Sequence, residues 1–194
     1  LSPTDRIPEL SLDRIHYGDF IDIVIKAVHT PSQFYVHVKQ FGTPKHLENL
    51  HSDMSKFYNS KVIRTKLHPP EQRDIVEGML FACAFGDIDG GGTSGAGNDV
   101  VGPSKWYRVM ANRTKTVKDD TVVCFFIDYG VINSVPRRNF RYLYHQFGTL
   151  RAQAVECNLA GIVRGSVPGS YGDWSFEVRN QFTRLLAPIK NGGS

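Results

Sequence analysis

One stretch, Val122–Val135, constrains the fold more than any other part of the chain. Its first half, Val122–Ile127, is an unbroken run of apolar, β-branched and aromatic residues, which is typical of a strand. Asp128-Tyr129-Gly130 interrupts the run, and because glycine adopts a positive φ at little cost, we expect a turn there. A second short strand is predicted up to Val135, where Pro136 ends it. The rings of this hairpin either pack in an ordinary core or, if the bend brings them to one rim of the sheet, line a pocket.

Strand and helix patterns flank this hairpin on both sides. Residues 19–28 alternate in polarity and residues 33–38 return after a Pro-containing turn, so they predict a hairpin. An apolar stripe at helical spacing predicts an amphipathic helix at about residues 46–59, and a connector follows over residues 60–70. Further strands are expected at residues 79–85, 106–111 and 153–159, and a short helical turn at residues 140–144. A last helix is expected, capped by Asp173 and carrying Trp174, Val178, Phe182 and Leu185 on one side.

These patterns predict a mainly β fold with flanking helices. The short strands between residues 71 and 136 suggest a small barrel of four or five strands. Neither residues 1–70 nor residues 137–194 are enough to form a hydrophobic core alone. We therefore expect them to complete one another as a second, split β-barrel lobe, with helix 46–59 as the linker. The Gly-rich segment 86–105 is expected to be a flexible loop, either native or engineered. It lacks the helix and the Lys-Ser/Thr of a phosphate loop, and Asn98 stands where a calcium loop that began at Asp87 would carry Glu.

Charge and cysteine usage narrow the function classes. The chain carries a net charge of +4, but residues 81–135 hold five Lys/Arg against six Asp, which is −1 and leaves +5 for the remainder. Apart from the cluster in Pro136–Arg141 the basic residues are scattered, whereas a nucleic-acid surface usually gathers them on one element. The three cysteines are odd in number and form no CxxC pair, so we expect reduced thiols, no disulfide framework, no zinc site and a cytosolic setting. We also expect no secretory signal and no membrane span.

Seven sequence blocks, in this order, resemble those of extended Tudor domains. They are His16–Ile23, Pro31–Val38, Leu80–Phe85, Trp106–Val109, Phe126–Gly130, Val135–Pro136 and Gln153–Cys157. The resemblance implies a Tudor barrel beside a staphylococcal-nuclease-like, OB-type lobe split across both ends of the chain. It also implies a non-catalytic module of the Piwi-interacting RNA pathway without a cofactor. Such a module would recognise arginine-containing tails of Piwi-type proteins, often symmetrically dimethylated, in cytoplasmic, perinuclear germ granules.

The same resemblance assigns the site residue by residue. An aromatic cage for the guanidinium would consist of Phe85, Tyr107, Phe126 and Tyr129, with Asp128 and Val131 beside it and Trp106 in the core. A cation over such rings gains about 0.5–2 kcal/mol per favourable contact. Val131 departs from the family, which usually has Asn there, and the missing polar contact to a charged group is worth about 1–3 kcal/mol.

Three alternatives to this assignment remain open. In the first, the cage is degenerate and the module binds protein partners independently of methylation. In the second, the OB-type lobe contacts RNA. In the third, the nuclease-like lobe cleaves nucleic acid, which is disfavoured because Asp19 and Asp22 near Arg14 form no wider cluster of carboxylates and arginines.

Overall fold

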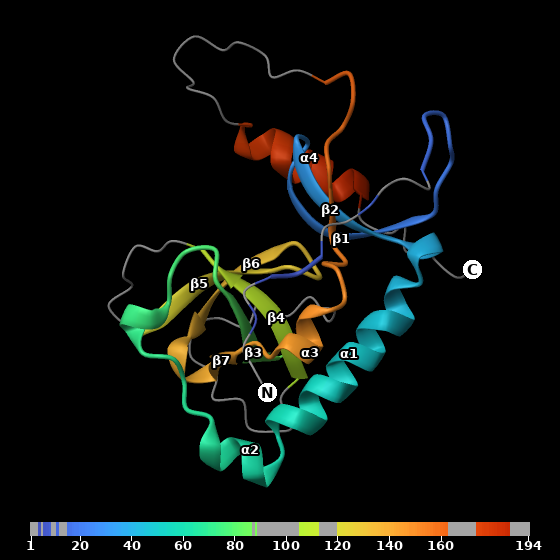
Figure 1. The fold of residues 1–194 in the computed structure, drawn as a ribbon. Coiled ribbons are helices and arrows are strands. Elements are labelled where there is room, and N and C mark those ends of the chain that lie inside the picture. Colours follow the sequence, from blue (N-terminus) through green and yellow to red (C-terminus); the bar gives the residue numbers. More distant parts are fainter. Residues whose placement is uncertain are drawn as a thin grey trace, which may run out of the picture.

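The computed structural model describes residues 4, 6–8, 11, 15–86, 88, 105–112, 120–162 and 174–186. These residues form two antiparallel sheets joined by one long helix (Figure 1). The predicted class, mainly β with flanking helices, is confirmed.

The larger sheet has five strands in the order β6-β5-β4-β3-β7. They are β3 (Leu80–Phe85), β4 (Lys105–Ala111), β5 (Thr121–Phe126), β6 (Val131–Pro136) and β7 (Phe140–Tyr142). Every residue of β3 is buried, as expected for a central strand of continuous apolar sequence. The helical turn predicted at 140–144 is wrong, because Phe140 and Tyr142 pair with Cys83 and Phe81 on the free edge of β3. The sheet therefore continues beyond residue 136, the predicted end of the barrel.

The smaller sheet has the order β1-β2-β8 among the described residues. It consists of β1 (Ile23–Thr30), β2 (Gln33–Val38) and β8 (Val155–Cys157), so the strand predicted at 153–159 is shorter than expected. Helix α4 (Phe176–Leu186) packs on it through Phe182, whose ring centroid lies 5.6 Å from that of Phe34. Leu185 is 82% exposed, so it does not belong to the packed side as predicted, and Asp173 lies outside the described residues.

Helix α1 (Thr43–Tyr58) confirms the predicted linker helix and begins three residues earlier than expected. It runs from the smaller sheet along β4 of the larger one (Figure 1). Its apolar stripe joins the main core through Leu47, Leu50, Met54 and Tyr58. The segment predicted as a connector contains a short helix, α2 (Lys61–Lys66), which Ser60 caps by accepting the Ile63 N–H at 3.3 Å. A single helical turn, α3 (His145–Gly148), follows β7, and 3-10 turns span Lys39–Phe41, Gln72–Asp74 and Arg137–Asn139.

The turn between β5 and β6, Ile127–Gly130, connects the two sheets. His37 Nε2 on β2 donates to the Asp128 carbonyl at 2.6 Å, and His29 Nε2 on β1 donates to the Gly130 carbonyl at 2.8 Å. The Tyr35 ring lies against Gly130 from the same side. The predicted turn at 128–130 is therefore present, and it is held by residues of the smaller sheet. The division of the chain into two lobes stays a prediction.

Candidate functional site

A cleft of about 460 Å³ opens beside this turn. Its walls come from both sheets and from α1, and the residues that line it are Val24, Lys26, His37, Lys39, Pro44, Leu47, Glu48, His51, Ser52, Ser55, Lys105 and Tyr129. This volume lies within the range of about 300–1,000 Å³ that is typical of ligand-binding pockets. Tyr129 is the one predicted cage residue among the lining residues.

The four predicted cage rings lie side by side. Ring centroids are 5.1 Å apart for Phe85 and Phe126, 5.7 Å for Phe126 and Tyr107, and 5.7 Å for Tyr107 and Tyr129. They are only 8%, 0%, 1% and 3% exposed in the order Phe85, Phe126, Tyr107, Tyr129. The structure thus brings the four residues together at one end of the larger sheet, but three of them lie behind Tyr129 in the core. The cage itself stays a prediction.

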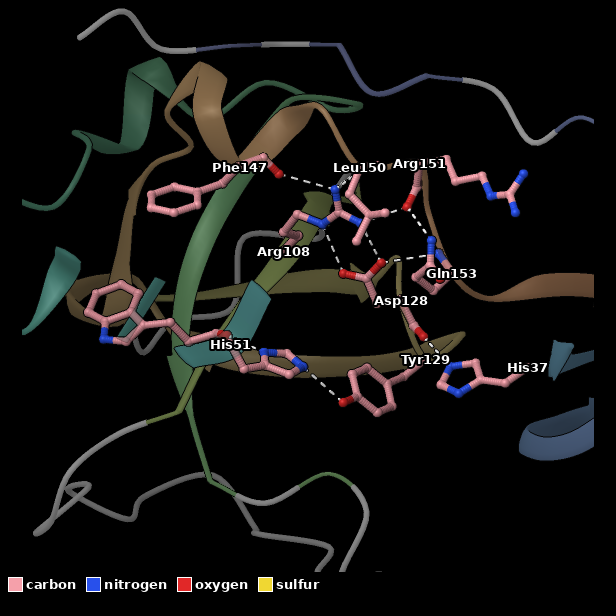
Figure 2. Close-up of polar contacts among 10 residues, drawn as sticks. His37, His51, Arg108, Asp128, Tyr129, Phe147, Leu150, Arg151 and Gln153 are labelled. Carbon is pink, nitrogen blue, oxygen red and sulfur yellow. Dashed lines mark hydrogen bonds and ion pairs between the residues drawn. The ribbon is translucent and has the colours of Figure 1, made fainter. Parts of the chain in front are cut away.

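His51 of α1 fills the space beside Tyr107 and Tyr129. Its ring centroid lies 4.8 Å from that of Tyr107 and 5.9 Å from that of Tyr129, on which it stacks. Its Nδ1 lies 2.7 Å from the Trp106 carbonyl, and its Nε2 lies 2.9 Å from the Tyr129 hydroxyl (Figure 2). Because a carbonyl can only accept, Nδ1 donates and neutral Nε2 accepts from the tyrosine hydroxyl. Burial lowers the pKa of His51, which favours this neutral form.

Tyr129 already carries a cation on its face. The Lys26 ammonium of β1 lies 5.4 Å from the centroid of the Tyr129 ring, within the range of a cation–π contact. His37 packs on the same ring, with centroids 5.6 Å apart. Lys26, His37 and His51 were not predicted from the sequence as site residues. The sequence carries one signal for the burial of His51, since it lies four residues after Leu47 and three before Met54, on the apolar side of the helix.

The Asp128 side chain lies inside the protein, away from the cleft. Its carboxylate receives two hydrogen bonds from Arg108, from Nε at 2.9 Å and from Nη2 at 2.6 Å, and a third from the Gln153 backbone N–H at 3.1 Å (Figure 2). The Arg108 and Asp128 side chains are 0% and 2% exposed. The negative charge of Asp128 is therefore neutralised inside the protein, and Asp128 does not line the cleft.

The two remaining residues of the prediction, Val131 and Trp106, pack in or against the main core. Val131 is half-buried and packs against the main core, outside the lining of the cleft. Trp106 is buried as predicted: it stacks on Tyr58 at 4.6 Å, and its Nε1 donates to Asn59 Oδ1 at 2.9 Å. Residues 89–104, the greater part of the Gly-rich segment, lie outside the described residues.

The lining of the cleft is basic. Lys26, Lys39 and Lys105 contribute three positive charges, and Glu48 contributes the one carboxylate among the described residues that line it. Nowhere in the described part of the chain do three or more His, Cys, Asp or Glu gather as metal ligands would. Within the same residues, the helices are too short or too polar to cross a membrane.

Comparison with known proteins identifies the domain type. The family model of the Tudor domain matches residues 102–161. Human Tudor domain-containing protein 5 is 25% identical over 163 residues, which cover 82% of this chain but only 15% of that protein. The chain thus spans a small part of the relatives that it matches.

Solved structures with a similar fold cover most of the chain. The extended Tudor domain TD3 of mouse TDRD1, in complex with a MILI peptide containing dimethylarginine, has a TM-score of 0.64 at 20% identity and covers 94% of this chain and 76% of its own. A variant of the Drosophila melanogaster Papi extended Tudor domain, in complex with an unmethylated Piwi N-terminal peptide, has a TM-score of 0.62 at 24% identity and covers 86% and 69%. Residues 102–161 therefore resemble a Tudor domain, and the overall fold of the chain is that of an extended Tudor domain.

Proposed function

We propose that this chain is a non-catalytic module that binds an arginine-containing peptide in the cleft, with the guanidinium over the face of Tyr129. The observation that carries the proposal is the Lys26 ammonium 5.4 Å from the centroid of that ring. It supports the proposal because a ring face that holds one cation has the position and electrostatics to hold another. An arginine would replace Lys26 there and gain about 0.5–2 kcal/mol from the ring.

The peptides bound by similar domains suggest the partner. The mouse TDRD1 domain was solved with a dimethylarginine-containing MILI peptide, and the Papi domain with Piwi N-terminal peptides in methylated and unmethylated forms. By analogy, the partner of this chain is an arginine-bearing tail of a Piwi-family protein. That partner would place the complex in the cytoplasm, in germ granules near the nucleus.

We propose further that methylation of the arginine adds little to the affinity. Phe85 and Phe126 are enclosed, and His51 packs against both Tyr107 and Tyr129. Methyl groups gain from a cage when rings surround them, whereas Tyr129 alone of the four predicted cage residues lines the cleft. Of the two peptide-binding alternatives left open by the sequence, this arrangement favours the degenerate cage.

Calorimetry with matched peptides tests the proposal. We expect an Arg-Gly peptide and its symmetrically dimethylated form to bind with dissociation constants within about threefold of each other, a difference below about 1 kcal/mol. Tyr129→Ala should weaken both by about tenfold or more, since it removes the ring and the hydrogen bond to His51. Val62→Ala, at an exposed position on α2, is the matched control. A lack of binding by either peptide at hundreds of micromolar would contradict the proposed function.

A further inference from the structure

The basic lining of the cleft has a consequence for the peptide that enters it. Its three lysines come from separate elements: Lys26 from β1, Lys39 from the 3-10 turn after β2, and Lys105 from the start of β4. Glu48 of α1 is the one carboxylate among the described lining residues, so the cleft carries a net charge of about +2 before any ligand binds.

An arginine adds a third uncompensated charge to this site. Like charges in a cleft with low-dielectric walls repel one another more strongly than in water. Moving Lys26 from the face of Tyr129 does not relieve this repulsion, because the displaced ammonium stays on the same strand. The buried Asp128 cannot compensate either, since its carboxylate is taken by Arg108. A ligand that brings its own negative charge would therefore be favoured.

We infer that the cleft selects peptides in which the arginine is flanked by Asp or Glu. This inference rests on the proposed function and specifies the chemistry of its ligand. Because Lys26 and Lys105 belong to strands of different sheets and both line the cleft, a carboxylate on either side of a bound arginine would have a lysine to pair with.

Three peptides of equal length test the inference. Each carries one unmodified arginine, flanked by Asp, Ser or Lys, and binding is measured by fluorescence anisotropy in 50 and 300 mM NaCl. We expect the Asp-flanked peptide to bind about tenfold tighter than the Ser-flanked peptide in low salt, and the Lys-flanked peptide to bind weakest. The differences in affinity should shrink in 300 mM NaCl, because the Debye screening length is then shorter than about 8 Å.

Protein variants locate the effect. Lys39→Gln and Lys105→Gln should each reduce the ratio between the Asp-flanked and Ser-flanked dissociation constants. Lys45→Gln, at an exposed position of α1 that does not line the cleft, should leave the ratio unchanged. A reduction by all three variants alike would overturn the inference, since it would reflect net charge alone.

The outcomes separate this inference from the proposed function. Equal affinity for the Asp-flanked and Ser-flanked peptides overturns the inference and leaves arginine recognition intact. A fourth peptide replaces arginine by Gln between the two Asp residues. If it binds as tightly as its arginine parent, arginine recognition is overturned, whereas a loss of binding supports arginine recognition.

Discussion

The guanidinium of Arg108 uses all its hydrogen-bond donors inside the protein. Nε and Nη2 bind the Asp128 carboxylate, Nη1 donates to the carbonyls of Phe147 and Leu150, and Nη2 also donates to the Arg151 carbonyl (Figure 2). Burying two charges costs several kcal/mol per ion unless such bonds replace the lost water. The pair therefore fixes the Asp128 turn and the 147–151 segment relative to β4, and so positions Tyr129.

Removal of Arg108 should destabilise the fold strongly. Arg108→Met leaves the Asp128 carboxylate buried without a counter-charge, and we expect the free energy of unfolding to fall by about 3–5 kcal/mol. Urea denaturation measures the change. As a control, Lys56→Ala removes an exposed ion pair with Asp53 and should cost less than about 1 kcal/mol. A loss from Arg108→Met no larger than that of the control would contradict this account.

His51 should make stability depend on pH. Its pKa is lowered in the folded state by burial, so between pH 7.5 and 5 the unfolded chain binds more protons at this residue than the folded chain. Stability should therefore fall as pH drops through the ordinary histidine pKa of about 6.5, by at most about 1.4 kcal/mol per pH unit. Urea midpoints across this range measure it. His51→Gln should flatten the dependence, and an unchanged pH profile in that variant would assign the effect elsewhere.

At the scale of elements, the turn Ile127–Gly130 fits against β2 with no space for a side chain. Gly130 has φ +75°, and a Cβ there would lie 2.1 Å from Cγ of Tyr35. The Tyr35 hydroxyl is held in turn by Glu156 of β8 at 2.7 Å. The glycine thus meets two requirements at once, a left-handed backbone and close approach to a fixed ring.

Gly130→Ala separates these two requirements when compared with Gly161→Ala. Gly161 has the same φ of +75°, but a Cβ there meets nothing within 4 Å. The Gly161 variant should cost only backbone strain, about 1–2 kcal/mol. The Gly130 variant should cost more, because Tyr35 must also move. Thermal unfolding of both proteins measures the difference, and equal losses would show that the contact with Tyr35 is unimportant.

Sequence reasoning succeeded where local composition decides the structure. The runs at 79–85, 106–111 and 122–127 are strands within one or two residues, and the apolar stripe of α1 is a helix. It failed where the structure of a segment depends on a partner that is far away in the sequence. Phe140–Tyr142 forms a strand because β3, some sixty residues earlier, offers a free edge. The contacts of Lys26 and His51 with Tyr129 depend on how β1 and α1 pack against the turn, which no spacing in the sequence encodes.

At the scale of the whole molecule, the turn Ile127–Gly130 and helix α1 both connect the two sheets, so their unfolding should be coupled. His29 and His37 of the smaller sheet hydrogen-bond to the turn of the larger one, and the Tyr35 ring packs against Gly130. Helix α1 contacts the larger sheet along β4. Loss of the smaller sheet would expose the buried Tyr129 and the apolar side of the turn to water. Because the two sheets share this buried interface, we expect them to unfold in a single transition, as single domains usually do.

The two tryptophans test this coupling because each reports on a different sheet. Trp106 lies in β4, whereas Trp174 donates its indole N–H to Ser32, in the turn between β1 and β2, at 2.9 Å. In Trp174→Phe the remaining fluorescence reports the larger sheet, and in Trp106→Phe it reports the smaller one. Within each variant, we expect the urea midpoint from fluorescence to coincide with that from far-ultraviolet circular dichroism, even if the substitution shifts both. Separate midpoints within one variant would show that the sheets unfold independently. The cleft would then be lost as soon as the less stable sheet unfolds, because its walls come from both sheets.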